Sequence, residues 1–136
     1  YYAAQFTLRA GLGRARGQGS LVRSLYVPDT GHLIKLDFNP QTGHEQAGWR
    51  PAIVLSPASY NRPTGLAIVA PITNQQKGYP FEVALPPGLK VTGVVLSDAI
   101  KNVDWRARNA RFVQAAPPEV LAEVRQRLGL LLGFNQ

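Results

Sequence analysis

The sequence contains no cysteine and no methionine, and it has only two histidines among its 136 residues. The lack of cysteine excludes a disulfide framework and a thiolate metal centre, and two histidines leave little for a zinc site. No run of 18 apolar residues occurs, and the N-terminal stretch lacks the apolar core of a secretory signal. These absences predict a cytoplasmic protein that uses no metal and no other cofactor.

The chain is basic, with 15 Lys and Arg against 8 Asp and Glu and a net charge of +7. Such a balance favours a polyanionic partner, either nucleic acid or an acidic protein segment. Residues 1–25 carry four of the arginines, no acid and no apolar periodicity. We expect them to form a flexible basic extension, with an RNA-gripping arm as the alternative. Residues 26–136 have the length and the apolar content of one folded domain.

Short apolar runs separated by turn-forming stretches dominate this domain. In the run 32–38, Ile34, Leu36 and Phe38 alternate with polar residues, as in a half-buried strand. Further strands are predicted at 51–56, 66–72, 81–85, 93–97 and 110–113, and turns are predicted between them, including 60–65. The pattern indicates a compact antiparallel sheet or small barrel.

One helix is predicted at 117–133, after two prolines and with Glu119 in its first turn. Apolar residues recur along it at helical spacing, at Val120, Leu121, Val124, Leu128 and Leu131. We expect this stripe to cover one opening or edge of the barrel.

The segment GHEQAGWRP, residues 43–51, places His44, Glu45 and Arg50 on one short loop. Because Arg50 precedes a proline, its backbone is restricted to extended geometry and its guanidinium is partly preorganised. A planar five-donor group suits a phosphate, both as a clamp and as a stabiliser of developing negative charge. The alternative is a solvated surface ion pair between Glu45 and Arg50.

Several motifs together resemble the MazF/PemK family of toxin-antitoxin ribonucleases over residues 26 to about 133. They are YVPDTGHLIKLDFNPQTGHEQAGWRPAIVLSPASYN, PIT, KGYPFEV, GVVLSD and VDWRARNA. The resemblance implies a mainly β fold, an SH3-like antiparallel barrel of the MazF/PemK/CcdB type with a C-terminal helix. It also implies a homodimeric mRNA interferase that cuts single-stranded RNA at short sequences without a metal, and an acidic MazE-like antitoxin that occupies the same basic groove.

Carried over from that family, the catalytic positions fall on Glu45, Arg50 and Thr73. In metal-free RNA cleavage the ribose 2′-OH attacks the adjacent phosphorus, so one proton must be removed and negative charge must be stabilised. We assign Glu45 as the general base, Arg50 as the charge stabiliser and a candidate proton donor, and Thr73 as a hydrogen-bond donor. His44 is the alternative base, since its ordinary pKa is near 6.5.

Six further residues are candidate RNA contacts: Trp49, Asn74, Lys77, Tyr79, Arg106 and Arg108. Trp49 either stacks a base or packs against the barrel, and KGYP either contacts RNA or forms a plain turn. Arg106 and Arg108 alternate onto one face and are expected to contact phosphate or an acidic partner. Trp105 is expected in the core or a dimer interface, and His32 at the surface.

Two other functions are compatible with the fold alone. One is a non-enzymatic toxin that poisons DNA gyrase, and the other is a module that binds RNA without cutting it. The combination of Glu45, Arg50 and Thr73 favours the endoribonuclease over both.

Overall fold

The computed structural model describes residues 26–38 and 48–134. The predicted N-terminal extension and the loop 39–47 lie outside these ranges. Within them the chain forms seven strands and two helices. In chain order these are β1 (His32–Asp37), β2 (Trp49–Val54), α2 (Ala58–Thr64), β3 (Leu66–Thr73), β4 (Glu82–Ala84), β5 (Val94–Leu96), β6 (Lys101–Asp104), β7 (Arg111–Ala115) and α3 (Pro118–Leu132).

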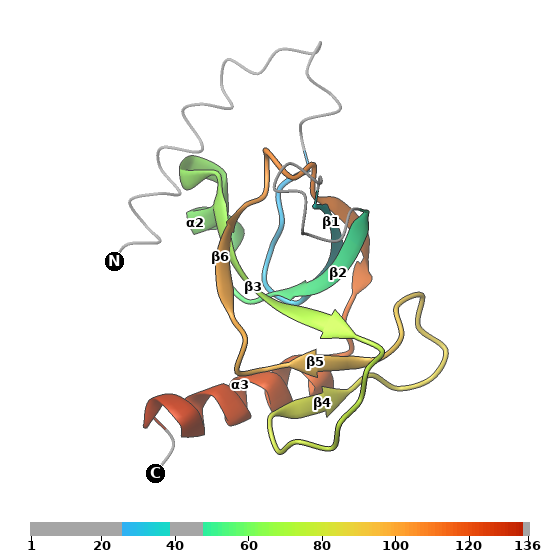
Figure 1. Ribbon diagram of the computed structural model, residues 1–136. Coiled ribbons are helices and arrows are strands. Elements are labelled where there is room, and N and C mark those ends of the chain that lie inside the picture. The colour runs from blue at the N-terminus through green and yellow to red at the C-terminus, as the bar shows by residue number, and fades with distance from the viewer. Residues whose placement is uncertain (1–25, 39–47, 135–136) are drawn as a thin grey trace.

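The strands form one antiparallel sheet in the order β4-β5-β3-β2-β1-β7, with β6 also paired to β3. The sheet curls into a barrel-like shape with α3 beneath it (Figure 1). In the part of the chain that the structure describes, no ladder joins the two ends of this path, β4 and β7. The predicted small antiparallel barrel with a C-terminal helix is confirmed, as an open form of that barrel.

Strand β3 connects the two parts of the sheet. Its first half, Leu66 to Val69, pairs with β6, and its last two residues, Ile72 and Thr73, pair with β5. Pro71 lies between these two ladders, where its missing N–H costs no hydrogen bond to either strand. The change of partner lets the chain turn the sheet over on itself, and it places the end of β3 beside β5.

The core has two parts, one on each face of the central strands. Leu33 of β1 belongs to a cluster that α3 covers with Val120 and Val124. Ile34 and Leu36 of the same strand belong to the second cluster, on the other face. Burial on both faces explains why the central strands read as nearly continuous apolar runs.

Helix α3 has a proline in its first turn, Glu119 beside that end and a left-handed Gly133 at its C-terminal cap. Val120 and Val124 are buried as predicted, but Leu131 is 49% exposed, so the predicted stripe is wrong at its C-terminal end. The last turn of the helix extends beyond the strands that cover its first two turns (Figure 1). Among the described helices, none combines the length and apolarity that crossing a bilayer requires.

The predicted turn at 60–65 is wrong, because residues 58–64 form helix α2. Asn61 in this helix is completely buried. Its amide nitrogen donates to the carbonyl oxygens of Pro28 and Ser56, at 2.8 and 2.9 Å. The indole N–H of Trp105 donates to the Asn61 carbonyl at 2.9 Å, so Trp105 lies in the core as predicted. Tertiary hydrogen bonds therefore stabilise a helix that shows no apolar periodicity.

Candidate functional site

Two of the predicted catalytic side chains, Glu45 and His44, fall in the loop 39–47 and lie outside the described residues. The structure does describe the end of that loop. Gly48 has a φ of 108°, a conformation that favours glycine, and Trp49 and Arg50 then begin β2. Arg50 is therefore part of a paired strand, as its position before Pro51 predicts.

Arg50 and Thr73 lie on the same face of the sheet. The β2–β3 ladder ends where Ala52 is opposite Pro71, and Arg50 and Thr73 each lie two residues beyond that pair, so strand alternation directs both side chains to the face of Ala52 and Pro71. Two predicted catalytic residues that are 23 positions apart in the sequence therefore lie on one face, each two residues beyond the last paired position.

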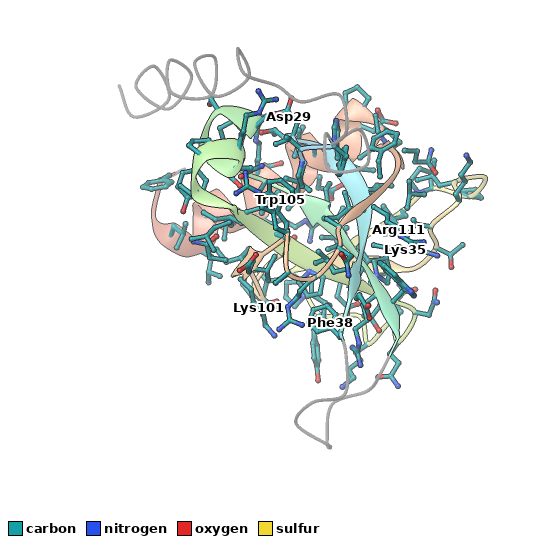
Figure 2. All side chains as sticks on the ribbon, turned by 90° about the horizontal axis from the view of Figure 1, so that it is seen from above. Asp29, Lys35, Phe38, Lys101, Trp105 and Arg111 are labelled. Carbon is teal, nitrogen blue, oxygen red and sulfur yellow. The ribbon has the colours of Figure 1, made fainter. Side chains whose placement is uncertain are left out.

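A hollow of about 130 Å³ lies beside Arg50. Its walls include the side chains of Phe38, Pro71, Lys101 and Val103, so the floor is apolar and two cations lie around it. The Arg50 guanidinium carbon lies 5.8 Å from the centre of the Phe38 ring, within the range of a cation–π contact. Phe38 and Lys101 lie close together in Figure 2. This arrangement can hold an anionic group next to an apolar one.

Thr73 is held at the end of β3 by a close backbone contact. Its Oγ1 accepts a hydrogen bond from the Gln75 N–H at 3.1 Å, which leaves the hydroxyl hydrogen able to donate elsewhere. Gly93, with a φ of 118°, lies so near that a Cβ there would be 2.3 Å from the Thr73 carbonyl oxygen. The strand end can therefore keep this position only with glycine at 93.

The predicted RNA contacts Asn74, Lys77 and Tyr79 lie in the loop that leaves β3 directly after Thr73. The Glu82 carboxylate accepts hydrogen bonds from the backbone N–H groups of Lys77 and Gly78, which folds the loop back on itself. Asn74 accepts a hydrogen bond from the Thr92 hydroxyl at 3.0 Å. Tyr79 is 61% exposed. The loop is therefore ordered by its own contacts and presents an aromatic ring to solvent.

The prediction that Arg106 and Arg108 alternate onto one face is wrong, because residues 105–109 form a turn. Arg106 stacks on the Trp105 ring at 4.9 Å, and its Nη2 donates to the Arg62 carbonyl at 2.6 Å. Arg108 instead lies over Phe38, at 4.4 Å from the ring centre. Only Arg108 thus joins the surroundings of Arg50, through the aromatic ring that both contact.

The side chain of Trp49 points to the opposite face of the sheet from that of Arg50, because consecutive side chains of a strand point to opposite faces. Its ring lies 4.3 Å below the Arg111 guanidinium carbon, and it remains 39% exposed. Sequence reasoning missed Arg111, Phe38 and Lys101 as site residues. Lys101 has a weak signal, because it lies two residues before Val103, the buried residue of an otherwise polar run, and so points to the same face.

His32, predicted at the surface, is half-buried. The backbone N–H of Asp29 donates to its Nδ1 at 3.3 Å, so this nitrogen is an acceptor and the Tyr26 hydroxyl, 2.8 Å away, donates to it. Phe112 packs edge-on against the imidazole at 4.8 Å between centres. Burial lowers the pKa of His32, and the nearby charge of Asp29 opposes this effect. Burial, aided by Asp29, raises the pKa of Tyr26. This cluster lies at the β1–β7 edge and shares no residue with the Arg50 hollow.

Comparisons with known proteins agree with this geometry. The family described as PemK-like, MazF-like toxin of type II toxin-antitoxin system matches residues 29–132. The endoribonuclease toxin MazF of Escherichia coli (strain K12) is 49% identical over 110 residues, which cover 81% of this chain and 98% of that protein. The endoribonuclease PemK of Escherichia coli is 34% identical, over 82% of this chain and 87% of that protein.

Solved structures give the same result. A crystal structure of MazE-MazF from Deinococcus radiodurans is 59% identical with a TM-score of 0.76, and the alignment covers 81% of this chain and 99% of that one. A mycobacterial endoribonuclease solved with its cognate antitoxin shares only 22% identity, with a TM-score of 0.66, and supports the fold alone. The curated relatives bear out the prediction of an endoribonuclease. The chain belongs to the PemK-like, MazF-like toxin family of type II toxin-antitoxin systems.

Proposed function

We propose that this protein is a toxin that cleaves single-stranded RNA at a specific short sequence without a metal ion. Membership of a family whose matched curated members are endoribonucleases supports the substrate. The observation that carries the proposal is the shared face of Arg50 and Thr73 beside a partly apolar hollow. A phosphodiester placed there meets the Arg50 guanidinium, with Thr73 on the same face two residues beyond Pro71 of the hollow, while the adjoining nucleoside can occupy apolar surface.

In the proposed reaction the ribose 2′-oxygen forms a bond to the adjacent phosphorus and the bond to the 5′-oxygen breaks. The products are a 2′,3′-cyclic phosphate and a 5′-OH end. Glu45 takes the proton of the 2′-OH, and Arg50 stabilises the charge on the phosphate oxygens. Thr73 donates a hydrogen bond to one of these oxygens. Because a guanidinium gives up its proton only with difficulty, charge stabilisation is the main role of Arg50, and proton donation to the departing 5′-oxygen is secondary.

His44 is the alternative base, and the pH dependence of the rate separates the two residues. If Glu45 is the base, Glu45→Gln abolishes the acidic limb of the pH–rate profile and His44→Ala preserves it. If His44 is the base, the effects are reversed. The profile measured on both variants and on the wild type therefore identifies the residue.

A MazE-like antitoxin is the proposed protein partner, and a homodimer is the proposed assembly. The related Deinococcus radiodurans structures are complexes of MazE with MazF. An acidic antitoxin segment would be attracted by Arg50, Lys101 and Arg108, the cations near the hollow. RNA and antitoxin should then compete for this surface, so that saturating antitoxin prevents RNA binding.

The test is incubation of the purified protein with a long RNA in the presence of EDTA, followed by mapping of the cut ends. We expect cuts at a defined sequence, with 5′-OH ends, and no cuts in a DNA copy of the same strand. Trapping of gyrase on DNA without RNA cleavage would favour the gyrase poison. Tight RNA binding without any cut would favour the non-cleaving module.

A further inference from the structure

We propose that Trp49 and Arg111 form a stacking platform for an unpaired base that flanks the cleaved phosphodiester. The inference rests on the proposed RNA cleavage and adds a specificity-determining contact outside the Arg50 hollow. Neither residue has a role in the chemistry proposed above. Arg111 comes from β7, at the far edge of the sheet from β3, so its contact with Trp49 depends on the folded β1–β2–β7 arrangement.

The platform is built by strand register. Lys35 in β1 is opposite Arg111 in β7, and the next outward-facing position of β1, Asp37, is opposite Trp49 in β2. These four side chains therefore share one face of the sheet. Lys35 and Arg111 lie side by side in Figure 2, in agreement with their pairing.

The contact leaves a flat surface available. The Arg111 guanidinium carbon lies 4.3 Å from the centre of the Trp49 ring, a stacking distance. Arg111 is itself exposed, and the indole keeps 39% of its surface accessible. RNA-binding proteins stack splayed bases on aromatic rings and on arginine planes. The pair offers both kinds of surface in contact with each other.

The charges on this face favour a base over a phosphate at Trp49. Asp37 is the direct neighbour of Trp49 and offsets the Arg111 charge there, so that Trp49 itself offers no excess positive charge to a phosphate. Lys35, one position further along the same face, would attract the sugar-phosphate backbone on that side. A single-stranded RNA fits these charges when a neutral base lies over the platform and the phosphate of that nucleotide lies toward Lys35.

The face that carries Trp49 and the face that carries Arg50 are close to each other at the start of β2. Trp49 and Arg50 are consecutive in β2, so the two sites lie on opposite sides of one strand near its start. An RNA bound at Arg50 would reach Trp49 by passing around this strand end. The platform would thus hold a nucleotide next to the cleavage site without touching the reacting atoms.

The first test measures kcat and KM on an RNA oligonucleotide centred on the mapped cleavage site. Trp49→Ala and Arg111→Gln should raise KM by about 5- to 100-fold, the range expected for one stacked base, with kcat nearly unchanged. Trp49→Phe keeps an aromatic face and should restore most of the affinity. Arg125→Gln on α3 removes the same charge at an exposed remote position, and it should leave both constants at the wild-type value.

The second test replaces each flanking base in turn by an abasic nucleotide. At one position the abasic replacement should weaken RNA binding to the wild type by about 5- to 100-fold. The same replacement should not change RNA binding to Trp49→Ala, because the base and the indole form one contact. Equal abasic penalties in both proteins would overturn the proposal. So would an unchanged KM in Trp49→Ala and Arg111→Gln, including the case in which these variants lose only antitoxin affinity.

A binding measurement separates failure of this inference from failure of the nuclease assignment. An RNA of the same sequence with 2′-O-methyl groups cannot be cleaved, and its stacking should quench the fluorescence of Trp49. Trp105 is buried, and the variant Trp49→Phe assigns the signal. Quenching without cleavage of ordinary RNA would support the platform and contradict the nuclease. Cleavage of ordinary RNA without quenching would support the nuclease and contradict the platform.

Discussion

Arg50 has a proline after it in the strand and an aromatic ring beside it, and both restrict where its guanidinium can lie. Replacement by alanine should reduce the cleavage rate about 100-fold or more, because the charge on the phosphate oxygens then lacks its main stabiliser. Arg50→Lys keeps the charge but lacks the planar pair of donors, so its cleavage rate should lie between those of the wild type and Arg50→Ala. Single-turnover rates on the mapped oligonucleotide provide the measurement. Near-normal cleavage by Arg50→Ala would contradict the assignment.

Gly93 offers a test of Thr73 that leaves the threonine in place. In Gly93→Ala the new Cβ would overlap the Thr73 carbonyl oxygen at 2.3 Å, so the end of β3 must move. Gly88→Ala is a matched control, because residue 88 also has a positive φ, of 95°, but has nothing within 4 Å of the added atom. Each variant should lose roughly 1–2 kcal/mol of stability from backbone strain. Only Gly93→Ala should also lose kcat, which urea unfolding and cleavage assays would show. Equal activity of both variants would mean that the position of Thr73 does not matter.

At the scale of elements, the β1–β7 edge contains a cluster with its own pH dependence. Burial lowers the pKa of His32 in the folded protein, whereas Asp29 opposes the change. Because a folded-state pKa below the ordinary value of 6.5 means that the unfolded chain binds the proton more tightly, acid favours unfolding. The contribution of His32 is therefore fully present above pH 6.5 and is lost as the pH falls through the lower folded pKa.

His32→Gln tests this linkage, since glutamine can accept the Tyr26 hydrogen bond but does not titrate. The wild type should lose more stability between pH 7.5 and pH 5.5 than the variant, as measured by urea unfolding at each pH. The other acids and His44 are common to both proteins, so the difference reports on His32. The same loss in both proteins would contradict the burial account.

The elements also show how far the sequence could predict the fold. Strand β1 was predicted correctly, because Ile34 and Leu36 alternate with polar residues. Strand β6 was missed, since Val103 is its one buried residue. Helix α2 was missed because its buried residue is Asn61, whose hydrogen-bond partners come from distant segments. Periodicity detects elements that bury apolar faces and cannot detect those held by specific polar contacts.

At the scale of the whole molecule, the resemblance to a family identified the residues of the candidate site but not their arrangement. The common face of Arg50 and Thr73 depends on the β2–β3 register, which the spacing of two residues in the sequence does not give. Phe38 and Lys101 reach the hollow from the end of β1 and from β6, and Arg111 of β7 reaches Trp49 on the opposite face. Their contribution follows from the way the sheet curls, which is a property of the folded chain (Figure 1).

The net charge of +7 is also a property of the whole molecule, and it attracts any polyanion. Attraction alone does not distinguish RNA from DNA or from an acidic antitoxin. The distinction belongs to the 2′-OH, which only RNA offers as a nucleophile. Selectivity for RNA in the cleavage step is therefore the central claim of this account.

The most direct measurement of that claim uses two RNA oligonucleotides that differ only in one 2′-hydroxyl, at the nucleotide whose 3′-phosphate is cleaved. We predict that the all-RNA strand is cut to a 2′,3′-cyclic phosphate and a 5′-OH end. The strand with the single 2′-deoxy nucleotide should remain intact while still competing for binding. Cleavage of the 2′-deoxy strand at the same bond and at a similar rate would contradict the mechanism.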